Sequence, residues 1–122
     1  MNNRSNLDRL KRARLDHVRL YAGSISLVFE SSEGLSIWIS TNCDLLILGE
    51  NGSEDYPLST AAFDQLVKSV DGHVDHLRNM PNGNYELMIG NQTFVIKDDG
   101  APGGIFRLTG KISDKILWDE FY

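Results

Sequence analysis

Alternation of apolar and polar residues predicts a β-hairpin in the first third of the chain. From Ser24 to Glu30 apolar side chains occupy every second position, with Val28 the one exception on the polar side. This period of two places them on one face of an extended strand. The alternation resumes from Leu35 to Ser40, after the run Ser31-Ser32-Glu33-Gly34, which is typical of turns. We therefore expect residues 24–40 to form an antiparallel hairpin.

A second group of alternating segments repeats this plan. The strands we expect in it are His73–Leu77, Tyr85–Ile89, Gln92–Lys97 and Ile105–Leu108. Gly90-Asn91 supplies a tight turn between two of them. His17-Val18 precedes the first hairpin as His73-Val74 precedes the second, and Ile39 and Ile96 are 57 positions apart. The repetition predicts two related meanders that arose by a degenerate duplication.

The segment between the two groups contains one predicted strand, one loop and one helix. Residues 45–48 are apolar on both faces, which favours a central or doubly covered strand. Residues 49–57 are acidic and contain Asn51-Gly52, so we expect a loop. From about residue 59 to 71 apolar side chains recur at helical spacing, and Gly72 follows as a candidate left-handed C-cap. This central helix is expected to lie across the sheet.

The two ends of the chain have less distinctive patterns. Residues 1–14 are basic and form either a short helix capped by Asn6 or a solvated arm. Residues 111–122 form an aromatic and acidic tail whose pattern fits a strand or a helix equally well. With residues 15–110 as a β-rich body, we predict a single α+β domain of 122 residues with mostly antiparallel sheet.

Charge is distributed unevenly and limits the classes of partner. Residues 1–19 hold six basic and two acidic side chains, a balance of +4, whereas the remaining 103 hold six and 15, a balance of −9. An acidic body is a poor nucleic-acid binder, because phosphate contacts need clustered Lys and Arg. It attracts a basic protein partner and accelerates that association.

Other sequence features favour a cytoplasmic protein that does not enter a membrane. No apolar run approaches the roughly 20 residues of a membrane helix. The first residues are polar and lead into no apolar signal region. Cys43 is the only cysteine, so an internal disulfide is excluded, which suits a reducing compartment.

Candidate catalytic and metal-binding groups do not form a recognised set. His73 and His76 would point to opposite faces of a strand, so they cannot share one metal ion with Asp75. Asp44 beside Cys43 opposes thiolate formation. The glycine-rich segment 100–104 lacks the Lys-Ser/Thr pair of a phosphate loop. We therefore predict a protein that is not an enzyme and that needs no cofactor or metal.

Surface residues are the remaining candidates for function. Interfaces are enriched in aromatic anchors, and carboxylates can pair with the cationic groups of a basic partner. The residues we select as partner-binding candidates are Glu50, Glu54, Asp55, Tyr56, Asp98, Asp99, Trp118, Asp119 and Glu120.

The arrangement of strands and glycine turns resembles one group of small bacterial proteins. It runs from Val18 through the hairpin at residues 25–39, a short helix and the strands at 74–98, to Gly104–Gly110. Proteins of this group consist of two tandem β-meanders. Many are encoded beside polymorphic or contact-dependent growth-inhibition toxins and are taken to be their immunity proteins. The resemblance covers about residues 15–110 and includes no shared catalytic or binding motif.

This resemblance implies that the chain binds the C-terminal domain of a cognate toxin, which would be basic and could be a nuclease. Binding would block the active site of the toxin or another essential surface. The alternative is a small non-enzymatic adaptor or a homodimeric assembly subunit joined through an exposed sheet edge. An enzyme with a pocket not visible in sequence, and a nucleic-acid role for the basic arm, are further alternatives.

Overall fold

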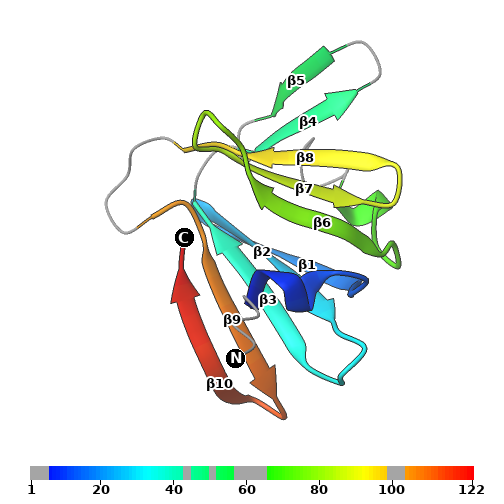
Figure 1. Cartoon of the computed structure of the whole chain (residues 1–122), viewed down its shortest axis with the longest axis vertical. Helices are drawn as coiled ribbons and strands as arrows, with labels where there is room; N and C mark the ends of the chain where they lie inside the picture. Colours follow the sequence, from blue (N-terminus) through cyan, green and yellow to red (C-terminus); the bar gives the residue numbers. More distant parts are fainter. Residues whose placement is uncertain (1–5, 43–44, 50–51, 57–65, 99–103) are drawn as a thin grey trace.

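The computed structural model describes residues 6–42, 45–49, 52–56, 66–98 and 104–122, with only the backbone described for 45–49 and 52–56. These residues form two antiparallel five-stranded sheets (Figure 1). The first sheet has the order β1 (Arg14–Tyr21), β2 (Ser24–Glu30), β3 (Ser36–Thr41), β9 (Arg107–Ile112), β10 (Lys115–Phe121). The second has the order β5 (Gly52–Tyr56), β4 (Leu45–Gly49), β8 (Gln92–Ile96), β7 (Tyr85–Ile89), β6 (Val74–Asn79).

The predicted first hairpin is confirmed as β2 and β3. Leu27 pairs with Ile39 and Phe29 with Ile37, and all four side chains are buried. The turn between the strands closes through Ser31, whose Oγ accepts hydrogen bonds from the backbone of Glu33 and Leu35. Gly34 takes a positive φ of 81° there, a conformation that glycine adopts at little cost.

The second group of strands is confirmed in part, because its last member lies in the other sheet. β6, β7 and β8 form the expected meander. β9 instead pairs with β3 in the first sheet, and β4 pairs with β8 in the second. Each half of the chain therefore gives a three-stranded meander to one sheet and a hairpin to the other. This corrects the expectation that residues 105–108 belong to the same unit as the strands between residues 73 and 97.

The two halves also meet where their meanders begin. Arg14 and His73 form an antiparallel bridge, and Arg12 N–H donates to the carbonyl of Val74 at 2.7 Å. Arg12 and Asp71, 59 positions apart, both have positive φ, at 69° and 74°. The halves thus share strand connectivity and this local turn geometry.

Two segments between the meanders differ from expectation. The predicted loop 49–57 contains an edge strand, β5, which sequence alternation misses because its residues are polar. Within the predicted helix 59–71, residues 66–68 are helical and a turn continues to Asp71, while residues 59–65 lie outside the described part. Asp71, and not Gly72, takes the left-handed conformation.

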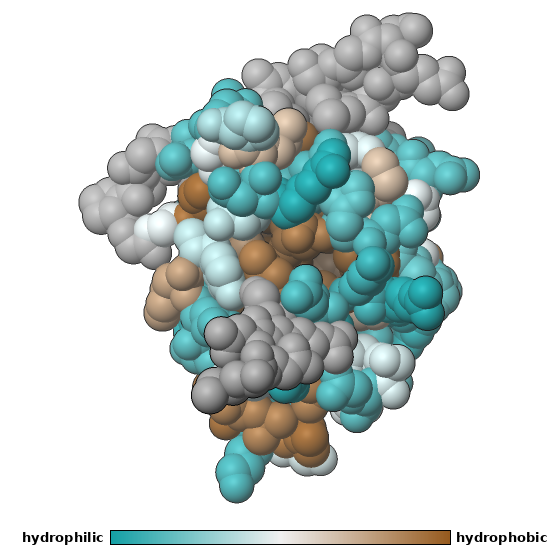
Figure 2. All heavy atoms as spheres, viewed as in Figure 1, coloured by the Kyte–Doolittle hydropathy of each residue, from teal (hydrophilic) through white to brown (hydrophobic). Residues whose placement is uncertain are grey.

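The N-terminal segment is described from residue 6, and residues 6–10 form a short 3₁₀ helix whose Leu10 is buried. The predicted tail 111–122 contains the end of β9, a turn and the edge strand β10. The main core cluster joins both sheets, with Phe29 and Ile37 from the first and Leu87 and Phe94 from the second fully buried. Figure 2 shows hydrophobic side chains between the sheets and a second group at the lower end, by the β9–β10 hairpin. No helix among the described residues is long and apolar enough to cross a membrane.

Candidate binding face

The first sheet turns one face toward the core and the other toward solvent. We call its solvent-side face the outer face. Alternation along β2 sends Leu27 and Phe29 inward, so Ser26 and Val28 belong to the outer face. Cross-strand pairing then aligns one row of outer side chains over all five strands. That row is Arg19, Ser26, Ser40, Arg107 and Phe121.

Trp38 lies at the centre of the outer face, on the middle strand β3. The guanidinium carbon of Arg19 lies 4.6 Å from the centre of its ring, and Nζ of Lys111 lies 4.1 Å from it. Both are cation–π distances. The indole Nε1 donates to Oγ of Ser36 at 3.0 Å, which fixes the orientation of the ring. His17 approaches edge-on at 6.4 Å between ring centres.

Small side chains beside Trp38 leave a hollow that we call the Trp38 groove. Ser24, Ser26 and Ser40 form its floor, and Tyr21, Trp38 and Lys111 are part of its wall. Its volume is about 430 Å³. The hydroxyls of Ser26 and Ser40 lie 2.8 Å apart and are hydrogen-bonded to each other. The groove thus combines hydroxyl groups with aromatic and cationic side chains.

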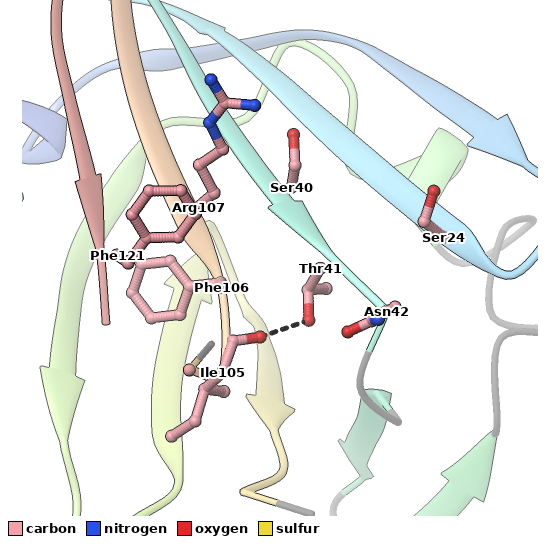
Figure 3. Close-up of a pocket in the computed structure, with 9 residues that line it drawn as sticks. Ser24, Ser40, Thr41, Asn42, Ile105, Phe106, Arg107 and Phe121 are labelled. Atoms are coloured by element: carbon pink, nitrogen blue, oxygen red, sulfur yellow. Dashed lines mark hydrogen bonds between the residues drawn. The ribbon is translucent and has the colours of Figure 1, made fainter. Parts of the chain in front are cut away.

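A second hollow of about 350 Å³ continues from the groove toward the end of the sheet and shares Ser24, Ser40 and Arg107 with it. Figure 3 shows Arg107 beside the ring of Phe121, with 5.7 Å between the guanidinium carbon and the ring centre. Thr41, which also lines this hollow, donates its hydroxyl to the carbonyl of Ile105 at 2.7 Å (Figure 3). The two hollows form one shallow surface feature.

Charge on this face is only partly balanced. Nε and Nη2 of Arg107 donate to the two carboxylate oxygens of Asp119 at 2.7 and 2.6 Å. These bonds hold the pKa of Asp119 below its usual range. Among the described residues, neither Arg19 nor Lys111 forms an ion pair. Arg19 instead donates from Nε to Nε2 of His17 at 3.0 Å, and the positive charge of Lys111 contributes to the lowered pKa of Asp119.

The three candidate residues in the tail have contacts within the protein. Asp119 is paired with Arg107, and Glu120 accepts a hydrogen bond from the side-chain amide of Asn6. Trp118 is half-buried and packs against the core beside Gly110, and its Nε1 has no hydrogen-bond partner within the described part of the chain. Contacts within the protein therefore already involve the charged and aromatic groups for which these tail residues were binding candidates.

The other candidates lie elsewhere in the fold. Glu54, Asp55 and Tyr56 are in β5, the edge strand of the second sheet, whereas the tail candidates are in β10 of the first. Asp98 is exposed after β8, and its backbone N–H donates to the side chain of Asn84. Glu50 and Asp99 lie outside the described residues. The candidates therefore belong to separate elements.

Sequence reasoning missed Arg19, Trp38 and Lys111 as a group. Each lies on a different strand, and only the register of the folded sheet brings them together. A signal was present in the hairpin, where Trp38 alternates with inward-facing Ile37 and Ile39.

The described histidines are in contacts that do not form a metal centre. A bulge between Val74 and His76 brings His76 Nε2 within 2.9 Å of Glu86, and Arg78 Nε donates to the same carboxylate oxygen at 2.7 Å. No group of three or more potential metal ligands occurs among the residues that the structure describes.

Comparisons of the chain with protein-family models, with curated proteins and with solved structures found no match.

Proposed function

We propose that this protein is a non-enzymatic immunity protein that binds a toxin domain and neutralises it through the outer face of the first sheet. The observation that carries the proposal is the composition of that face. Trp, Tyr and Arg are enriched among residues that dominate binding energies, and the outer face presents Trp38, Tyr21 and Arg19. Phe121, 66% exposed, and Ile116, 52% exposed, add apolar surface on β10.

A sheet face of this kind suits binding better than chemistry. It is shallow, so it would cover a partner's surface and block access to it, as neutralisation requires. The protein's net charge of −5, with Glu54, Asp55 and Asp98 outside the outer face, would attract a basic toxin from a distance. We keep the cytoplasm as the proposed compartment, which a chain with one cysteine suits.

Co-expression tests the proposal. A protein captured from lysate of the source cells should be toxic when expressed alone and harmless when co-expressed with this chain. Trp38→Gln should abolish capture and protection, because it removes the central aromatic side chain. Asp75→Asn, an exposed change on β6 of the second sheet, should leave both intact. Failure to find a toxic partner, or full protection by folded Trp38→Gln, would contradict the proposal.

A homodimer is the second candidate, favoured by the exposed edge of β10. Ile116 and Leu117 on this edge strand are 52% and 47% exposed, and unpaired edges readily add another strand. Light scattering should then give a mass that rises with concentration and returns to 13.7 kDa in Leu117→Lys. A concentration-independent mass of 13.7 kDa for the unaltered chain would remove this candidate.

A further inference from the structure

Three polar side chains of β1 form a chain of hydrogen bonds that ends at the ring of Trp38. Nδ1 of His17 lies 2.7 Å from a carboxylate oxygen of Asp16, and Nε of Arg19 donates to Nε2 of His17 at 3.0 Å. The guanidinium carbon of the same Arg19 lies 4.6 Å from the centre of the Trp38 ring. The position of Arg19 over the ring is therefore linked to the state of His17.

These contacts assign the protons of the His17 ring. Since Nε2 accepts a hydrogen bond from Arg19, it carries no proton, so the ring is neutral and its one N–H is at Nδ1 and donates to Asp16. A proton added at Nε2 would place two N–H donors face to face and two positive charges side by side. Nδ1 keeps its proton in both states, so the contact that breaks is the one between His17 and Arg19.

The surroundings of His17 can accept a positive charge. The hollow around it, of about 340 Å³, is lined by the guanidinium of Arg19 and by the carboxylates of Asp16, Glu30 and Asp114. Val28 faces His17 from β2 and the edge of Trp38 faces it from β3, and neither side chain titrates.

The carboxylate of Asp16 remains ionised when His17 takes up a proton. Hydrogen bonds from His17 and Arg14 hold the pKa of Asp16 below its usual range. A protonated His17 would therefore form an ion pair with Asp16, while the bond to Arg19 is lost.

We propose that His17 is a proton-operated latch on Arg19: neutral His17 holds the guanidinium over Trp38, and protonated His17 releases it from the ring. Lys111 comes from β9, on the other side of β3, and keeps its place over the ring. The consequence for binding rests on the proposed function. Protonation adds positive charge to the face that would meet a basic toxin, so acid should weaken that complex.

A pH titration of the full-length chain, without a partner, tests the latch. NMR follows the indole N–H signal of Trp38 and the ring signals of His17 from about pH 8 to about pH 5, where histidine changes charge. Both should move with one common midpoint. His17→Gln removes the titrating group and Arg19→Gln removes the guanidinium, so each should abolish the movement of the Trp38 signal. His76→Gln, which alters a histidine of β6 in the second sheet, should preserve it.

The other outcomes overturn the inference. A His17 that does not titrate in this range, or a Trp38 signal that stays in place while His17 titrates, would exclude the latch. Movement that persists in Arg19→Gln would show that His17 acts on the ring directly, and its loss in His76→Gln would show a general effect of acid on the fold. The co-expression test is independent: protection without a pH response rejects the latch alone, and a pH response without a toxic partner rejects the immunity function alone.

Discussion

Asp119 and Lys111 lie on the same face of neighbouring strands, yet their availability to a partner differs. The carboxylate of Asp119 accepts hydrogen bonds from both Arg107 and Thr109, whereas Lys111 lies over Trp38 and is in no ion pair within the described part of the chain. Sequence shows which side chains are charged, but these partners depend on pairing between distant strands. This is why the acidic tail was selected and Lys111 was not.

Gly110 illustrates the same dependence at an inward position. Its missing side chain makes room for the indole of Trp118 on the paired strand. Gly110→Ala should therefore lower the free energy of unfolding by about 1–3 kcal/mol, the range for overpacking. Combining it with Trp118→Leu should reduce this cost, and chemical denaturation of both variants and of Trp118→Leu alone measures the coupling. An equal cost in both backgrounds would contradict the contact.

Glu86 should give the stability a measurable pH dependence. Burial alone would raise the pKa of Glu86, but the hydrogen bonds from His76 and Arg78 outweigh it and leave the pKa below its usual range. The ionised form therefore stabilises the fold above the pKa of the unfolded chain, and this contribution is lost as the pH falls through the lower, folded-state pKa.

Denaturation of the unaltered chain and of Glu86→Gln between about pH 6 and about pH 3 tests this. At the higher pH the free energy of unfolding of the unaltered chain should exceed that of Glu86→Gln by roughly 1–2 kcal/mol. At the lower pH the two free energies should become equal. A difference that is constant over this range, or that grows as the pH falls, would contradict the assignment.

At the level of elements, alternation predicted strands that contribute to the core and missed the polar edge strand β5. β2, β3, β7 and β8 each have buried apolar side chains at every second position, some with further buried residues between them, so their period is visible in the sequence. β5 is an edge strand of mostly polar residues, so its sequence shows no alternation of apolar side chains, and its pairing with β4 identifies it as a strand. Each half contributes a hairpin to the sheet that contains the meander of the other half. This arrangement depends on pairing of β3 with β9 and of β4 with β8, which no local pattern encodes.

The β9–β10 turn supplies a prediction about local strain. Ser113 and Asp114 connect the two strands, and both have positive φ, at 48° and 67°, as hairpin turns of two residues often require. Asp114→Gly should raise the free energy of unfolding by about 0.5–1 kcal/mol, because glycine adopts this conformation with less strain. Thermal denaturation measures the change, with Asp114→Asn as the control for lost charge. A lower Tm for Asp114→Gly than for Asp114→Asn would contradict this assignment.

At the scale of the whole molecule, the two sheets use their faces differently. The inner faces share a main core cluster, while the outer face of the first sheet presents an aromatic and cationic centre with apolar side chains on β10. The β9–β10 hairpin completes this surface, because it brings Arg107, Lys111 and Phe121 from the second half of the chain into the first sheet. The first meander alone would present Trp38 without Lys111 beside it.

The most direct test of the proposed docking face uses the indole N–H signals of the chain's two tryptophans in an NMR spectrum. Trp38 is on the outer face and Trp118 packs on the core side beside Gly110, so the two report on different surfaces. Trp118→Phe assigns the signals. On addition of the captured toxin domain, the Trp38 signal should shift or broaden while that of Trp118 stays in place. A shift of Trp118 alone, or of neither signal in a formed complex, would contradict docking on the outer face.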